Sequence, residues 1–187
     1  MRHVGRVTNP PLGLIAVGPL VEVTIQPHAV VAAQFTAQGL PVPAEAARLM
    51  VDTGAQRTCI DQAIAARLGL APIRYEPMVG VSQKAENYPV FLVQMGLGMA
   101  EGEITQQAIW SAEVVGVPTI SVGAHAGLIG RDFLAHFDFR YHGRDGTFEL
   151  VTPVQVGTDA SRREKEELRA KRKVERQARK KNRNRRR

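Results

Sequence analysis

The sequence has one cysteine, few aromatic residues and no long apolar run. The single Cys59 excludes an internal disulfide and leaves no cysteine cluster for a structural zinc site. On the same ground we expect a reducing, cytoplasmic compartment. No segment has the length of a membrane-spanning helix. Aromatic residues are only 5% of the 187-residue chain, while Val, Ala, Leu and Gly are plentiful, and this composition suits short strands joined by tight turns.

Positive charge is scarce in most of the chain and concentrated near its end. Residues 1–160 carry 10 basic and 14 acidic groups, a net charge of −4, whereas residues 161–187 carry 15 basic and 4 acidic groups, a net charge of +11. We therefore expect a mildly acidic domain followed by a basic tail, residues 156–187, that is helical or disordered. Two interpretations of residues 162–187 stay open: attraction to nucleic acid or another polyanion, and a solubilising tail without a fixed partner.

The N-terminal part is expected to lead into a single domain. Residues 1–19 contain three prolines, so an irregular segment is predicted. The apolar stretch 12–23 loosely resembles the core of a signal peptide, but Pro19 and Glu22 interrupt it. We expect a linker there, with a weak export signal as the alternative. Residues 20–155 then have the length of one domain with one hydrophobic core.

Most of this domain has strand-like patterns. The alternation over Val21–Ile25 predicts a half-buried strand, and Val30–Phe35 is expected to be its hairpin partner. A polar tip at residues 82–87 predicts a hairpin within 75–95, and Asp145-Gly146 predicts a second hairpin. Further strands are expected at residues 48–51, 104–115, 117–122, 139–141 and 147–151.

Helices are expected at only one or two places. Asp61 is a good N-cap and Gly69 a good terminator for a helix over residues 61–68. Residues 132–137 are expected to form a helical turn, and Gly127–Gly130 a tight apolar turn. The predicted fold is all-β: a small closed barrel or sandwich with one or two short helices.

An aspartate stands where a buried strand ends. Arg48 is followed by three apolar residues, 49–51, and then directly by Asp52, Thr53 and Gly54. Burying a carboxylate costs several kcal/mol, roughly, unless the group is paired or hydrogen-bonded. Asp52 is therefore either an ordinary exposed turn residue or a functional group, and its context favours the second interpretation.

Three stretches, in order, resemble parts of aspartic proteases. Val51–Ala55 resembles the active-site loop, and Leu128-Ile129-Gly130-Arg131 resembles the hydrophobic segment that supports this loop. Between them, a hairpin carrying Val79, Gly80, Val81 and Ser82 is similar in position to the flap that closes over substrate. Residues 20–152 thus resemble the single-domain, retroviral-type (retropepsin-like) aspartic proteases, especially bacterial members, and the resemblance implies a small acid-protease barrel.

The resemblance also implies the assembly and the chemistry. A single Asp-Thr-Gly implies a homodimer in which two Asp52 carboxylates share a proton and activate a water that attacks a peptide bond. Thr53 would bond across the dimer, Gly54 would allow close approach of the substrate backbone, and Leu128, Ile129 and Gly130 would pack beneath the loop. Ala55 would complete the active-site loop. The expected function is that of an aspartic endopeptidase, which requires no metal or organic cofactor.

The chain departs from the retroviral pattern at one position. Retroviral enzymes usually have an acidic residue two places after the glycine, facing an arginine; Arg131 is present here, but the other position is Gln56. A glutamine–arginine hydrogen bond is the expected substitute. Gln56 also keeps an alternative open, a non-catalytic dimerisation or binding module of the same fold whose tail binds nucleic acid.

The remaining reactive residue types have ordinary interpretations. The five histidines lack the spacing of metal ligands. Cys59 lies between Thr58 and Ile60 and is expected to be a small buried side chain rather than a nucleophile.

Overall fold

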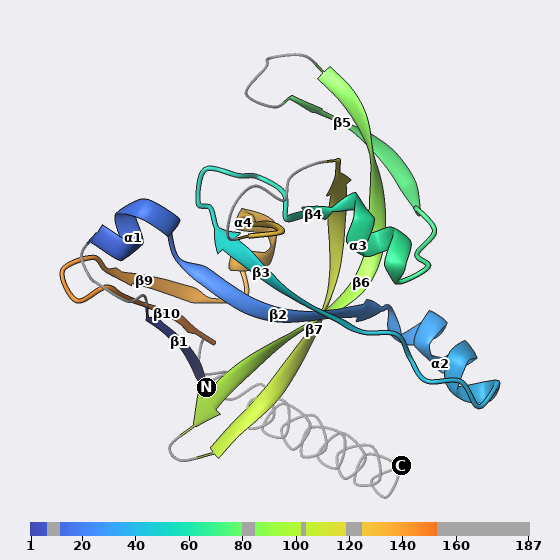
Figure 1. The fold of residues 1–187 in the computed structure, drawn as a ribbon, viewed down its shortest axis with the longest axis horizontal. Helices are drawn as coiled ribbons and strands as arrows, with labels where there is room; N and C mark the ends of the chain where they lie inside the picture. The colour runs from blue at the N-terminus through green and yellow to red at the C-terminus, as the bar shows by residue number, and fades with distance from the viewer. Residues whose placement is uncertain (7–11, 80–84, 102–103, 119–124, 153–187) are drawn as a thin grey trace, which may run out of the picture. The chain divides into compact units, whose positions relative to one another are not determined.

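The computed structural model describes residues 1–6, 12–79, 85–101, 104–118 and 125–152 (Figure 1). Residues 1–153 form one compact unit, and the predicted basic tail, residues 156–187, lies outside the described residues. The elements of this unit, in chain order, are β1 (Arg2–Arg6), α1 (Leu12–Val17), β2 (Leu20–Pro27), α2 (Ala29–Ala37), β3 (Glu45–Val51), β4 (Cys59–Asp61), α3 (Gln62–Arg67), β5 (Arg74–Val79), β6 (Ala85–Glu101), β7 (Ile104–Val117), β8 (Gly127–Ile129), α4 (Arg131–Leu134), β9 (Asp138–His142) and β10 (Thr147–Val151).

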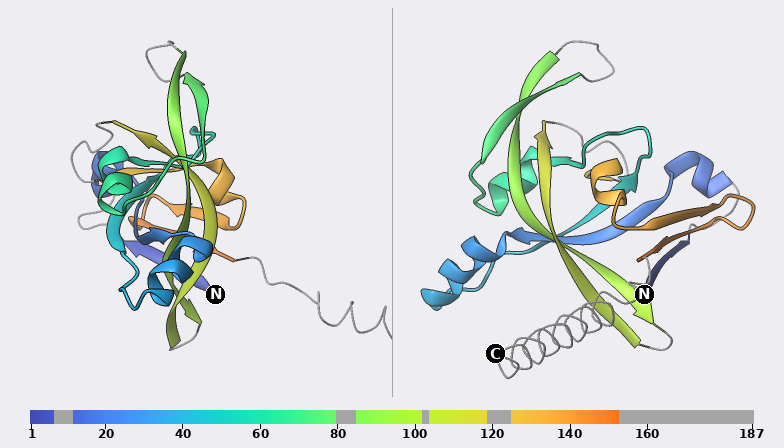
Figure 2. Two further views of the ribbon diagram at one scale, coloured as in Figure 1. Left: turned by 90° about the vertical axis from the view of Figure 1, so that its right-hand side faces the viewer. Right: turned by 180° about the vertical axis from the view of Figure 1, so that it is seen from behind.

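Six strands close into a barrel. Around it the pairing order is β2, β3, β8, β4, β7, β6 and back to β2. The β3–β8 and β4–β7 pairs are parallel and the others are antiparallel. β1, β10 and β9 extend the sheet from the far end of β6, whereas β5 pairs with the beginning of β6 and projects from the barrel (Figures 1 and 2). The predicted all-β barrel is thus confirmed.

The barrel interior is apolar because the inward positions of each strand follow a period of two. Val21, Val23 and Ile25 of β2 alternate with more exposed residues, as predicted from the sequence. Full burial of one such side chain contributes about 1.5–3 kcal/mol. The core thereby holds in place the end of β3, which leads directly to Asp52. Its largest fully buried members include Ile25, Leu49, Met95, Leu97, Met99 and Ile129.

Several local predictions are confirmed. The helix after Asp61 is α3, in which the Asp61 carboxylate accepts a hydrogen bond from the Ala63 amide at 2.8 Å. Gly69 follows with a φ of +64°, a left-handed conformation that glycine adopts without strain. The β5–β6 and β9–β10 hairpins are both present. The described unit nevertheless holds four short helices where one or two were expected.

The hairpin partner predicted at Val30–Phe35 is wrong, because this segment is helix α2. His28 provides the N-cap by accepting a bond from the Val30 amide, and four alanines favour the helix. Gly39, with a φ of +69°, follows its end. None of the helix is buried. The strand that pairs with β2 is instead β3.

The turn predicted at Gly127–Gly130 is also wrong, because residues 127–129 form strand β8 between β3 and β4. Its glycine serves close packing. A Cβ atom at Gly127 would lie 2.2 Å from the Cys59 carbonyl oxygen. The segment predicted to be irregular, residues 1–19, likewise contains β1, which pairs along the whole of β10, and α1, which buries Leu14. Such pairing over long sequence separation leaves no local signal.

Candidate active site

Asp52 lies where β3 leaves the barrel. Met50 and Val51 pair with Leu128 and Ile129 of β8, and the Asp52 amide continues this ladder by donating to the Ile129 carbonyl at 3.0 Å. Val51 is buried, whereas the Asp52 side chain is only partly so. The carboxylate therefore emerges from an anchored strand into an accessible loop.

The loop folds back on the Asp52 side chain. Asp52 Oδ1 accepts a hydrogen bond from the Gly54 amide at 2.8 Å, and the Ala55 amide donates to the Asp52 carbonyl at 3.2 Å. A Cβ atom at Gly54 would lie 3.1 Å from Asp52 Oδ1, so a side chain there would crowd the carboxylate. Thr53 and Gly54 are exposed. The loop thus presents one carboxylate, held on one oxygen, beside two exposed small residues.

Arg131 fastens this loop from the other side. Its Nη1 donates to the carbonyl oxygens of Thr53 at 3.0 Å and Gly54 at 3.2 Å, and its amide donates to the Ala55 carbonyl at 3.0 Å. Among the contacts of the described residues, the expected bond between Arg131 and the Gln56 side chain is not present; Gln56 is exposed, and its carbonyl accepts from the Asp132 amide. The arginine therefore holds the loop through backbone groups.

The segment expected to support the loop lies directly against it. Ile129 is fully buried in the barrel and Leu128 partly so. Gly130 packs so closely on the neighbouring backbone that a Cβ atom would lie 2.4 Å from the Arg57 carbonyl carbon and 2.8 Å from the Thr58 nitrogen. Only glycine fits at this contact between the end of β8 and the chain entering β4.

Sequence reasoning missed a second support, formed by Thr58 and Asp132. The Thr58 side chain is fully buried, and its hydroxyl donates to Asp132 Oδ1 at 2.7 Å and accepts from the Gly130 amide at 3.1 Å. The Phe133 amide also donates to Asp132 Oδ1, at 2.8 Å, so this carboxylate bonds to the backbone of α4 as well. An aspartate following Gly-Arg at a helix start was the available signal.

The hairpin expected to be the flap is formed by β5 and β6. Their register runs from Arg74 opposite Val90 to Val79 opposite Ala85. Val79 is 67% exposed, and Gly80, Val81 and Ser82 lie outside the described residues. We call residues 74–79 and 85–90 the β5–β6 arm.

Cys59 is buried, as expected. Burial and the nearby Asp132 carboxylate raise the pKa of its thiol from 9.0 to about 11. Since the thiolate is the reactive form, this thiol is a poor nucleophile at neutral pH. In the described part of the chain, no three His, Cys, Asp or Glu side chains gather as metal ligands do, and none of the helices is long and apolar enough to span a membrane.

The sequence matches a known protein family over the region that contains Asp52 and Arg131. The sequence model of a family described as aspartyl protease matches residues 22–133, more than half of the chain. The chain belongs to the aspartyl protease family. The matched range contains the Asp52 loop, the β5–β6 arm, β8 and the beginning of α4, and it leaves β1, β9 and β10 outside.

A comparison with solved structures matches a retropepsin-like aspartic protease from Rickettsia conorii. It is 14% identical in sequence, the comparison covers 80% of this chain and 89% of that chain, and the TM-score is 0.43. No curated protein matches the sequence.

Proposed function

We propose that this member of the aspartyl protease family is an endopeptidase that hydrolyses peptide bonds with a water molecule activated between two Asp52 carboxylates, one from each subunit of a homodimer. The observation that carries the proposal is the Asp52 loop. Its carboxylate ends a buried strand, is held on one oxygen by the Gly54 amide and keeps partial exposure. The loop lies within the range matched by the family.

The proposed dimer follows from the chemistry. One carboxylate must take a proton from the attacking water while another donates a hydrogen bond to the developing oxyanion. The matched range contains a single Asp-Thr-Gly sequence, at Asp52. A second copy related by a two-fold axis supplies the second Asp52, because such an axis brings one surface of the chain against itself.

The neighbouring residues then take distinct roles. The Thr53 hydroxyl, exposed in the single chain, bonds across the dimer and holds the two loops together. Gly54 leaves room for the substrate backbone, and Ala55 completes the loop. Leu128, Ile129, Gly130 and Arg131 support the loop, and the substrate is covered by Val79, Gly80, Val81 and Ser82.

A separate role is proposed for residues 162–187. The 15 cationic side chains of residues 161–187 contrast with a net charge of −4 in the rest of the chain. We infer that this segment binds nucleic acid or another polyanion by releasing condensed counterions, without sequence selectivity. It would then concentrate the protease near polyanionic partners.

The test of the catalytic proposal is Asp52→Asn. Asparagine has nearly the same shape but cannot accept and return the proton, so peptide cleavage should be abolished while the protein stays folded and dimeric. Wild-type activity should be greatest at acidic to mildly acidic pH, where the paired carboxylates hold one proton. A purified wild-type dimer that cleaves no peptide over this pH range would favour the alternative, a non-catalytic dimerisation module.

A further inference from the structure

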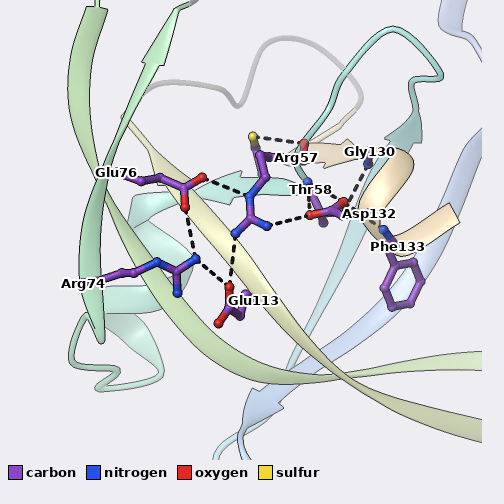
Figure 3. A network of polar contacts seen from close by, with 9 residues as sticks. Arg57, Thr58, Arg74, Glu76, Glu113, Gly130, Asp132 and Phe133 are labelled. Atoms are coloured by element: carbon purple, nitrogen blue, oxygen red, sulfur yellow. Dashed lines mark hydrogen bonds and ion pairs between the residues drawn. The ribbon is translucent and has the colours of Figure 1, made fainter. Parts of the chain in front are cut away.

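Arg57 joins the active-site loop to the β5–β6 arm through a ring of alternating charges (Figure 3). Its Nε lies 3.0 Å from Glu76 Oε1, and its Nη2 lies 3.4 Å from Glu113 Oε2. Arg74 Nη2 closes the ring, at 3.1 Å from Glu76 Oε2 and 2.6 Å from Glu113 Oε2. We call Arg57, Glu76, Arg74 and Glu113 the charge ring.

The backbone at Arg57, from which one member of the charge ring extends, is held by hydrogen bonds and close packing. Arg57 directly precedes Thr58, whose amide and hydroxyl both donate to Asp132. The carbonyl carbon of Arg57 packs against Gly130. The Arg57 Nη1 also lies 3.6 Å from Asp132 Oδ2. The guanidinium therefore extends from the hydrogen-bonded, closely packed base of the Asp52 loop.

The other side of the ring has few other attachments to the barrel. Within the described sheet β5 pairs only with β6, and none of its six residues is buried. Glu76 and Met78 are its two partly buried positions. Glu76 contacts Arg57, and Met78 packs against the small cluster of Cys59, Val90 and Val115. β5 is thus tied to the barrel by the ion pairs Glu76–Arg57 and Arg74–Glu113 and by the packing of Met78, beside its ladder with β6.

The Arg57–Glu76 pair is shielded more than an ordinary surface ion pair. Both side chains are 23% exposed. The Arg57 Nε is buried, and its alignment with Glu76 does not satisfy a hydrogen bond, so the attraction is mainly ionic. Removing one partner of such a pair costs more than it does at an exposed pair, because a partly buried charge then loses a partner.

We propose that Arg57 is a positioning residue that holds the β5–β6 arm over the Asp52 loop through Glu76, and that it governs substrate capture more than bond cleavage. This inference rests on the proposed function. Val79, the last described residue of β5, is only three positions beyond Glu76. A change of direction at Glu76 is therefore carried to the residues expected to cover the substrate. A displaced arm weakens contacts that are made in both the bound and the transition state, which raises KM while kcat changes little.

The first test uses hydrogen–deuterium exchange and needs no catalysis. Glu76→Gln removes the negative charge facing Arg57, and we expect amide exchange across residues 74–79 to become about fivefold faster. The matched control is Glu86→Gln, which removes a charge from the same arm. Glu86 accepts a hydrogen bond from the Tyr88 hydroxyl at 2.7 Å and is not a member of the charge ring. Exchange at β10 should be unchanged in both variants. Equal exchange of residues 74–79 in the two variants would overturn the proposal.

Salt provides a second readout on the same samples. Arg57, Glu113, Asp132 and His136 line a pocket of about 210 Å³, so dissolved ions can approach the ring. Raising the salt concentration should speed exchange of residues 74–79 in the wild type and have little further effect in Glu76→Gln. A salt response of the same size in both proteins would contradict an ionic attachment of the β5–β6 arm through Glu76.

Kinetics then separate a positioning role from a merely structural one. Glu76→Gln should raise KM about fivefold with kcat within about twofold, and Arg57→Lys, which keeps the charge, should lie between wild type and Arg57→Gln. A fall in kcat with KM unchanged would overturn the positioning role. If the wild-type protein shows no Asp52-dependent cleavage but Glu76→Gln still speeds exchange, the proposed function is refuted. The attachment of the β5–β6 arm through Arg57 and Glu76 is then still supported.

Discussion

Thr58 donates two hydrogen bonds to Asp132 across 74 residues of sequence, one from its amide at 2.9 Å and one from its hydroxyl at 2.7 Å. The same hydroxyl accepts from the Gly130 amide. A single buried threonine thus ties the beginning of β4 to the end of β8 and the beginning of α4. These are the elements that support the Asp52 loop.

Replacing this hydroxyl should destabilise the protein markedly. Thr58→Val keeps the shape but leaves the buried Gly130 amide without its acceptor and Asp132 with one donor fewer, at a cost of about 2–3 kcal/mol. The control is Thr152→Val, which removes an exposed hydroxyl that donates to the Met1 carbonyl. Urea unfolding should show a loss below about 1 kcal/mol for this control. Equal losses would mean that the Thr58 network has no special weight.

The close packing of β8 gives a second prediction. Gly127→Ala places a methyl group 2.2 Å from the Cys59 carbonyl oxygen, so the backbone must shift, at a cost of about 3 kcal/mol or more. Gly98→Ala is the matched control, because a Cβ atom at this β6 glycine meets nothing within 4 Å. Thermal unfolding of the two variants checks this. A Gly127→Ala protein as stable as Gly98→Ala would refute the packing argument.

Part of the fold and of the candidate site could be predicted from the sequence. Short-range chemistry was predictable: Asp61 and Gly69 bound α3, Asp145-Gly146 joins β9 to β10, and the period-two alternation of β2 gives the buried face. Asp52 was identified from its place after an apolar strand and from its triplet.

Features that depend on distant partners were not predictable. Val30–Phe35 contains β-branched residues that suit a strand, yet its end groups and alanines favour α2, and β3 takes the place beside β2. Gly127 of β8 resembles a turn residue locally, and only its contact with Cys59 reveals its role. The charge ring joins residues from two strands, β5 and β7, and from the loop before β4, and its members have no common spacing in the sequence.

The Cys59 thiol should react slowly in the folded protein. Burial raises its pKa to about 11, two units above the ordinary value, so the folded protein has about a hundredfold less thiolate at pH 8 than the unfolded chain. Reaction with a chromogenic disulfide should be slower by at least about this factor in buffer than in urea, because the thiol is also buried, and should accelerate as the pH rises. Equal rates in buffer and urea would contradict the burial of this thiol.

A chain ending at Thr158 tests the role of the basic segment. It keeps every described strand, so it should fold and retain Asp52-dependent cleavage, but it loses the 15 cationic side chains of residues 161–187. Affinity for RNA, DNA or heparin should largely disappear. For the full chain, binding should fall with salt by a log–log slope of roughly −0.7 to −0.9 per neutralised phosphate. Unchanged polyanion binding after truncation would refute this role.

The central claim is that one active site needs Asp52 from two chains, and subunit mixing tests it most directly. Wild type and Asp52→Asn are mixed in equal amounts at a fixed total concentration, allowed to exchange subunits, and assayed for peptide cleavage. With random pairing and inactive mixed dimers, activity should be about one quarter of that of the same total amount of wild type, because only dimers with two aspartates cleave. Activity of about one half, which independent sites on single chains would give, would contradict the shared active site.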